Sequence, residues 1–125
     1  MDTNFIISFL DGKENAVLVY EEIRDAQLTI TAIASVVLFE ILRGKEQSQI
    51  KIEKFEELRR KLEVLPFGER EAEEAGKTEK AIHKKGLNVD LPDLLIGATA
   101  KTHGAILITN DGGFDNFEGL QLRNY

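Results

Sequence analysis

Four acidic residues of the 125-residue sequence occupy positions at which a folded chain could bring them together. Asp2 precedes an apolar segment, Glu40 lies inside a second, Asp93 opens a third, and Asp111 follows a fourth. Converging carboxylates repel one another unless a cation lies among them. Ligation by oxygen alone suits Mg²⁺ or Mn²⁺, and such ions activate water and hold a phosphate for in-line displacement. The four acids therefore predict metal-dependent phosphodiester hydrolysis.

Each acid taken alone has an ordinary structural interpretation. Asp2 could cap the helix that follows it, Asp93 could be favoured by the dipole of a first helical turn, and Asp111 could form a turn. Glu40 differs, because the helix around it is apolar nearly all round and is predicted to be buried. A buried glutamate needs a cation, a partner or a raised pKa, and Arg43 one turn later could form a salt bridge with it. The functional hypothesis therefore depends on the joint placement of the acids.

Alternating helices and strands would position these acids. Apolar periodicity and end signals predict helices over residues 4–10, 14–26, 35–43, 47–62, 69–85 and 92–103. Short strands are predicted at residues 1–3, 28–31, 64–66, 105–109 and 120–122. Asp90 and His103 are expected to cap the two ends of the last helix. Such alternation predicts an α/β fold with a parallel sheet, one domain over residues 1–125, and a ligand site at the carboxyl ends of the strands.

The composition limits the classes of protein and of site. The sequence has no cysteine, which excludes disulfides, zinc–thiolate sites and thiol nucleophiles and fits a reducing cytosol, so we predict a cytoplasmic protein. We recognise no signal peptide and no membrane-spanning segment. The net charge of −6 disfavours a nucleic-acid binder, but residues 43–61 carry seven bases and four acids, a local charge of +3. This segment is either an RNA-facing patch or a solvated helix with pairs such as Glu57–Lys61.

Four segments together resemble the motif blocks of PIN domains of the VapC type. They are residues 2–7, 39–44, 92–100 and 107–114, and their order and spacing are similar to those of that family. The resemblance covers essentially the whole chain. It implies a PIN-like three-layer fold with a central parallel sheet of about four to five short strands flanked by helices. It also implies an endoribonuclease toxin that cleaves RNA, forms a homodimer and is blocked by a VapB-like antitoxin.

The same resemblance implies roles for individual residues. Asp2, Glu40 and Asp93 match the core ligands of the family's Mg²⁺ or Mn²⁺ site, and Asp111 matches its fourth acidic position. Residues beside these acids are expected to orient the ligands: Thr3, Asn4, Thr109 and Asn110. Arg43 could contact the substrate phosphate, and it is equally well placed to be the counter-ion of Glu40.

The sequence departs from the family pattern at two places. PIN domains usually have a few apolar residues before the first aspartate, whereas Met1 directly precedes Asp2 here. Either the central strand is truncated or the chain starts late. The last block often carries another acid just before its phenylalanine, where this sequence has Gly113, and Asp115 follows Phe114. The missing acid predicts weaker binding of a second metal ion.

Two other classes of function compete with a nuclease. A non-catalytic PIN-like domain would serve as an interaction module, which the acidic net charge favours and the complete set of four acids disfavours. A phosphotransfer domain could use Asp2 as its nucleophile. Haloacid-dehalogenase-like phosphatases, however, place a second aspartate where this chain has Asn4, and receiver domains need a lysine where it has Asn110 and Asp111.

Overall fold

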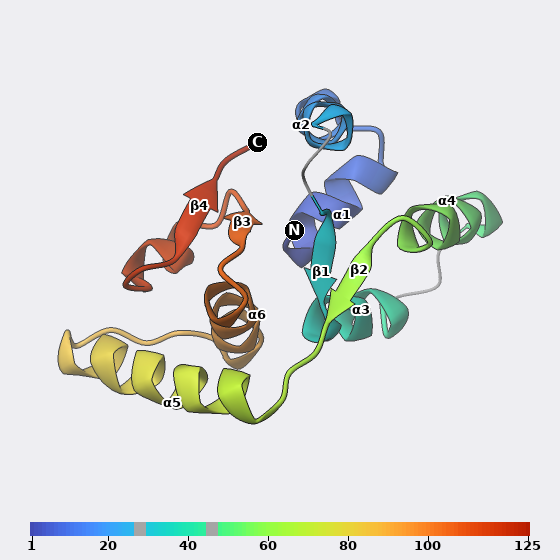
Figure 1. Cartoon of the computed structure of the whole chain (residues 1–125). Helices are drawn as coiled ribbons and strands as arrows, with labels where there is room; N and C mark the ends of the chain where they lie inside the picture. Colours follow the sequence, from blue (N-terminus) through green and yellow to red (C-terminus); the bar gives the residue numbers. More distant parts are fainter. Residues whose placement is uncertain (27–29, 45–47) are drawn as a thin grey trace.

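The computed structural model describes residues 1–26, 30–44 and 48–125, in which short helices and strands alternate (Figure 1). The helices are α1 (Thr3–Leu10), α2 (Glu14–Asp25), α3 (Ser35–Leu42), α4 (Gln49–Arg59), α5 (Glu69–Lys84) and α6 (Leu91–Thr102), and a 3₁₀ helix, η1, spans Gly112–Asn116. The strands are β1 (Ala32–Ala34), β2 (Glu63–Leu65), β3 (Ile106–Ile108) and β4 (Gln121–Arg123). The predicted α/β class is confirmed.

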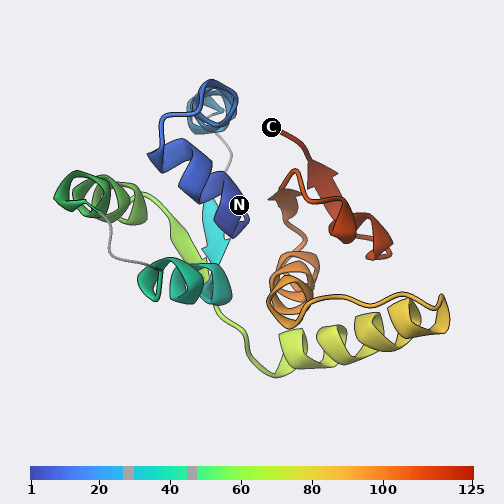
Figure 2. The same cartoon turned by 180° about the vertical axis from the view of Figure 1, so that it is seen from behind.

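The strands lie in two parallel pairs rather than in one continuous sheet. β1 pairs with β2, so that Ile33 lies beside Val64, and β3 pairs with β4, so that Leu107 lies beside Leu122. Figures 1 and 2 show the two pairs facing each other from opposite sides of the molecule's centre, with the amino terminus between them. The prediction of parallel strands is confirmed, and in the described residues these strands form two separate pairs.

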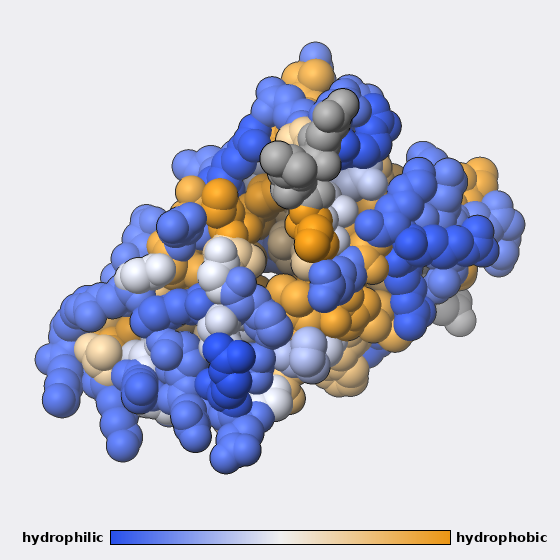
Figure 3. Space-filling view, viewed as in Figure 1, coloured by the Kyte–Doolittle hydropathy of each residue, from blue (hydrophilic) through white to orange (hydrophobic). Residues whose placement is uncertain are grey.

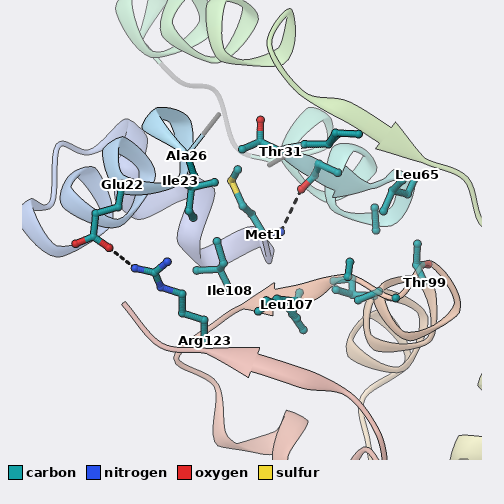
Figure 4. A pocket seen from close by; sticks show the side chains of 18 residues that line it. Met1, Glu22, Ile23, Ala26, Thr31, Leu65, Thr99, Leu107, Ile108 and Arg123 are labelled. Atoms are coloured by element: carbon teal, nitrogen blue, oxygen red, sulfur yellow. Dashed lines mark hydrogen bonds and ion pairs between the residues drawn. The ribbon is translucent and has the colours of Figure 1, made fainter. Parts of the chain in front are cut away.

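Residues 1 and 2 lie where a central strand would join the two pairs. The amino group of Met1 donates to the carbonyl of Ala32 in β1 at 3.2 Å, and the amide of Asp2 donates to the carbonyl of Ile108 in β3 at 3.1 Å. The predicted strand at residues 1–3 does not form, because α1 begins at Thr3 with Asp2 as its N-cap. An apolar cavity of about 450 Å³ opens beside Met1, bounded by residues of β1 and β3 (Figure 4).

The second strand also differs from its prediction. Of the predicted stretch 28–31, residues 28 and 29 lie outside the described part of the chain, and β1 begins only at Ala32. β1 is set by its parallel partner, since Ile33 is buried and lies beside Val64, whereas Ile30 is exposed. Pairing and burial thus decide the strand, not the β-branched composition of the earlier residues.

The hydrophobic core draws buried residues from all six helices and from β1 and β3. Phe5 and Ile6 of α1 are fully buried, and α6 packs against α5, which it crosses (Figure 2). Gly97 of α6 permits a close approach, because a Cβ there would lie 2.3 Å from Cε1 of Phe117. Such a distance is far below van der Waals contact, so the ring of Phe117 occupies the space that a side chain would need.

The prediction that α3 is buried nearly all round is wrong. Val37 and Ile41 are buried, but Phe39 and Leu42 are 58% and 57% exposed. The helix has only eight residues and packs on α1, α6 and β1, and none of the described residues covers Phe39 and Leu42 fully. Apolar residues therefore reach the surface of the molecule, as they also do on the face shown in Figure 3.

The basic segment 43–61 is largely the helix α4. Its predicted pair forms, with Lys61 Nζ 3.9 Å from a carboxylate oxygen of Glu57, and Lys51 pairs at 2.5 Å with Asp11, which lies in the turn after α1. Residues 45–47, including the base Lys45 and the first residue of the predicted helix, lie outside the described residues. These pairs favour a solvated helix over an RNA-facing patch. No helix within the described ranges combines the length and the apolar character needed to cross a bilayer.

Candidate active site

Asp2 lies between the two strand pairs, β1–β2 and β3–β4, which form the two halves of the fold. Its side chain is buried, with Oδ1 accepting from the amide of Phe5 at 2.8 Å as the cap of α1, and Oδ2 accepting from the hydroxyl of Thr109 at 2.5 Å. Burial raises the pKa of Asp2, the two hydrogen bonds and the neighbouring amino terminus oppose that rise, and the charge of Asp111 adds to it. The N-cap interpretation is confirmed, and it leaves a buried carboxylate beside β3.

Glu40 is oriented by α1 rather than by a basic residue. It is half-buried on α3, and its Oε1 accepts from the hydroxyl of Thr3 at 2.7 Å. Arg43 follows α3 as its C-cap, and its guanidinium lies 5.3 Å from the centre of the Phe39 ring. No ion pair joins Arg43 to Glu40 among the residues described. The counter-ion interpretation of Arg43 is therefore wrong, and its guanidinium is exposed.

Asp93 is the predicted acid whose pKa responds to the other three. It lies half-buried in the first turn of α6. Burial is the largest cause that raises its pKa to about 6, and nearby negative charges raise it further: Asp111, Asp90, Glu40 and Asp2. Each of the other three predicted acids thus acts on Asp93, although they are 91, 53 and 18 positions away in the sequence. A carboxyl group in such surroundings is stabilised by any cation that offsets the charge.

Asp111 stands in the turn after β3. It caps η1, with Oδ1 accepting from the amide of Gly113 at 2.8 Å, and its own amide donates to the hydroxyl of Thr109 at 3.0 Å. Thr109 therefore contacts two of the predicted acids at once, since the same hydroxyl donates to Asp2. The turn interpretation of Asp111 is confirmed, and its side chain is exposed.

The neighbouring residues divide into those that touch an acid and those that do not. Thr3 and Thr109 make the expected hydrogen bonds to carboxylates. Asn4 is exposed, and its side chain makes no hydrogen bond with the part of the chain described. Asn110 points elsewhere, because its amide group exchanges two hydrogen bonds with the main chain of Tyr125. Asn110 makes no side-chain hydrogen bond to any of the four acids among the described residues, and its role in orienting a ligand stays a prediction.

The four acids influence one another electrostatically without surrounding a single point. Within the described ranges, no three Asp, Glu or His side chains are arranged to hold one metal ion. Like charges without a cation between them separate, and neutral donors take their oxygen atoms: Thr109 and the Phe5 amide for Asp2, and Thr3 for Glu40. The assignment of all four acids as metal ligands stays a prediction.

Sequence reasoning missed two residues beside the acids. Asp90 was expected only to cap α6; it does stand at the N-cap but its side chain makes no capping hydrogen bond, and its charge raises the pKa of Asp93. Spacing could have indicated this, because residues three apart at a helix start share one end of the helix. Tyr125 contacts Asn110 through its main chain, and no local pattern in the sequence predicts that contact.

Comparison with known proteins agrees with this architecture. The sequence matches the family model of the PIN domain over residues 1–120. It is 34% identical over 97 residues to Ribonuclease VapC1 of Rickettsia felis, a match that covers 72% of each chain. The crystal structure of VapBC2 from Rickettsia felis, bound to a DNA fragment of its promoter, has a TM-score of 0.85 at 25% identity and covers 99% of this chain and 96% of that one.

A second solved structure shows the same fold. DNA-bound VapBC from Salmonella typhimurium has a TM-score of 0.82 at 24% identity, and the match covers 98% of this chain and 94% of that one. The resemblance carried by the four motif segments is thereby confirmed. Because the family model spans nearly all of the sequence and the ribonuclease relative shares a third of the aligned residues, the chain belongs to the PIN-domain family.

Proposed function

We propose that this chain is a divalent-metal-dependent endoribonuclease of the VapC type, with Mg²⁺ or Mn²⁺ as its cofactor. The observation that carries the proposal is the raised pKa of Asp93, which burial and the charges of the other three predicted acids produce together. None of the four forms an ion pair with a lysine, arginine or histidine of the described residues. Negative charge thus collects at one place without a protein cation to offset it.

The residues present fit such a cation by their chemistry. All the donors are carboxylate oxygens, which suit hard ions such as Mg²⁺ and Mn²⁺ better than zinc. Asp2, Glu40 and Asp93 would hold the ion, with Asp111 as the fourth acid. The ion would supply a water of lowered pKa and would neutralise charge on the phosphodiester.

The chain's own side chains prepare the site for this role. Thr109 and Thr3 hold the carboxylates of Asp2 and Glu40 through their hydroxyls, so that each retains one fixed orientation. Asp93 keeps its proton up to a pH of about 6 and releases it when positive charge arrives, so acidic solution competes with the metal. The exposed guanidinium of Arg43, one turn beyond Glu40, is placed to contact an RNA phosphate.

We also propose that a VapB-like antitoxin binds this chain and that the chain is the toxin of the pair. Solved relatives are VapBC complexes, and the ribonuclease relative is named VapC1. Phe39 and Leu42 are exposed on the helix that carries Glu40, and an uncovered apolar surface of this kind marks a site of protein interaction. A partner seated there would also close access to Glu40. The family resemblance further supports a homodimer.

RNA cleavage by the purified chain tests the proposed activity. Single-stranded and structured RNAs are incubated with Mn²⁺ or Mg²⁺, with EDTA, and with the variants Asp93→Asn and Asp25→Asn. Asp25 is an exposed acid of α2 outside the site, so its variant controls for the loss of one charge. Cleavage lost with EDTA and in Asp93→Asn, but kept in Asp25→Asn, supports a metal-dependent ribonuclease. Absence of cleavage together with no metal-induced rise in melting temperature would instead favour the non-catalytic interaction module.

A further inference from the structure

Residues 121–125 touch three separate parts of the molecule. β4 pairs with β3, and the carbonyl of Arg123 accepts from the amide of Thr109 at 3.0 Å just beyond the strand. The guanidinium of Arg123 forms an ion pair with Glu22 of α2 (Figure 4). Two residues further on, Tyr125 reaches both α1 and the turn after β3. This short segment therefore crosses from one half of the split sheet to helices of the other.

The contacts of Tyr125 are specific in geometry. Its amide donates to Oδ1 of Asn110 at 2.8 Å, and Nδ2 of Asn110 donates to its main-chain oxygen at 2.8 Å. Its ring meets the ring of Phe5 edge to face, with the centroids 4.9 Å apart and an interplanar angle of 83°. Paired main-chain bonds and an edge-to-face ring contact each restrict the relative position of the groups that they join.

Both partners of Tyr125 are attached directly to predicted metal ligands. Asn110 lies between Thr109, whose hydroxyl donates to Asp2, and Asp111. Phe5 gives its amide to the carboxylate of Asp2. Tyr125 therefore connects the turn that carries Asp111 to the helix that Asp2 caps.

This connection adds to the contacts that join the two strand pairs near the acids, among them the packing of α6 against α3 and β1. Residues 1 and 2 bridge the strand pairs through hydrogen bonds of Met1 with Ala32 and of Asp2 with Ile108 and Thr109, and the cavity of about 450 Å³ lies beside that bridge. Small changes in how the halves sit would change the separation of Asp2 from Asp111. The affinity of a site built from both halves would follow that separation.

We infer that Asn110 and Tyr125 form a clamp that positions Asp2 and Asp111 relative to each other and thereby sets the affinity of the divalent-cation site. The inference rests on the proposed function for the metal, and it makes both members of the clamp positioning residues. Neither is a ligand. Asn110 acts through the turn that it immobilises, and Tyr125 acts through Phe5.

Four variants separate positioning from general stabilisation. Asn110→Ala removes both hydrogen bonds, and Tyr125→Ala removes the ring while leaving the main chain. Tyr125→Phe keeps the ring, and the phenol hydroxyl that it loses makes no hydrogen bond with the described residues, so it is the matched control. Glu22→Gln breaks the exposed ion pair with Arg123 on the same segment, away from the acids. For each, the melting temperature is followed as Mn²⁺ is titrated, which gives both the metal-free stability and the apparent affinity.

We expect Asn110→Ala and Tyr125→Ala to weaken the apparent Mn²⁺ affinity by about tenfold, the lower range for groups that orient metal ligands. Tyr125→Phe and Glu22→Gln should bind Mn²⁺ with the affinity of the wild type, whatever the effect of each substitution on the metal-free melting temperature. If the two alanine variants melt earlier but bind Mn²⁺ as well as the unchanged protein, the clamp is only structural and the inference is overturned.

Hydrogen exchange distinguishes failure of the inference from failure of the proposed function. The amides of Phe5 and Asp111 donate to Asp2 and Thr109, so a loosened clamp should speed their exchange more than that of amides in the middle of α5. Faster exchange in a protein whose melting temperature never responds to Mn²⁺ would support positioning of the acids and refute the metal site. Unchanged exchange at both amides in Asn110→Ala would refute the clamp by itself.

Discussion

Replacing Thr109 with valine should destabilise the protein far more than its small change in shape suggests. The residue is 1% exposed, and its hydroxyl is the donor to Oδ2 of Asp2 and the acceptor for the amide of Asp111. Valine preserves the branched outline but leaves Oδ2 of the buried Asp2 carboxylate without its donor and the Asp111 amide without its acceptor. A hydrogen bond to a charged group contributes about 1.5–3 kcal/mol and a neutral one about 1 kcal/mol, so we expect a loss on the order of 3 kcal/mol.

Urea unfolding in EDTA measures this loss, with Thr109→Ser as the control that keeps the hydroxyl. The valine variant should show a lower midpoint at an unchanged slope, and its melting temperature should fall by about 10 °C. The serine variant loses only a methyl group and should lose about 1 kcal/mol. If valine and serine variants unfold within about 0.5 kcal/mol of each other, the hydroxyl does not hold Asp2, and the reasoning about this junction is refuted.

Three further outcomes follow from the structure. Gly97→Ala, which in most helices is stabilising, should cost about 2 kcal/mol in urea unfolding because of overlap with Phe117; a gain in stability would contradict that contact. Without metal, the wild type should lose stability relative to Asp93→Asn as the pH rises from about 4 to 6, because the folded carboxyl, with a pKa of about 6, keeps a proton that the unfolded chain has released. If the difference in unfolding free energy between the wild type and Asp93→Asn stays constant over that pH range, the pKa of Asp93 is not raised. The buried amino group of Met1 should change stability with pH in the opposite direction. Burial lowers its pKa to about 6, so the unfolded chain holds a proton that the folded chain has lost, and stability should rise between about pH 6 and 8. Acetylation of the amino group should abolish that rise.

The local patterns of the sequence predicted most of the helices and the turn chemistry. Asp2 and Asp111 stand at their expected places because capping and turn formation depend on residues two or three positions away. Such short-range hydrogen bonds are visible in the sequence itself. The alternation of strands and helices also predicted that the distant acids would converge, and their charges do act on Asp93.

Contacts made across the fold could not be read in the same way. Glu40 was expected to pair with a cation or with Arg43, its neighbour in the helix, but it accepts from Thr3, 37 positions earlier. Asn110 was assigned to the metal site by its position beside Asp111, yet its partner is Tyr125, whose place depends on how β4 pairs with β3. In both cases the sequence identified a polar group that needs a hydrogen-bond partner, but the partner itself is determined by tertiary packing.

Packing also decided how much of α3 is covered. Its sequence is apolar nearly all round, which predicted burial, but an eight-residue helix that packs on one side leaves Phe39 and Leu42 exposed. Composition cannot distinguish an apolar side that faces the core of its own chain from one that faces a partner.

Calorimetric titration with Mn²⁺ at pH 7.5 tests most directly whether the four acids form one divalent-cation site. The unchanged protein and Asp25→Asn should bind Mn²⁺ with the same affinity, and Asp93→Asn should bind at least about tenfold more weakly, because the group at the centre of the negative charge is lost. Equal affinity in all three proteins, or no saturable binding to the unchanged one, would contradict the account.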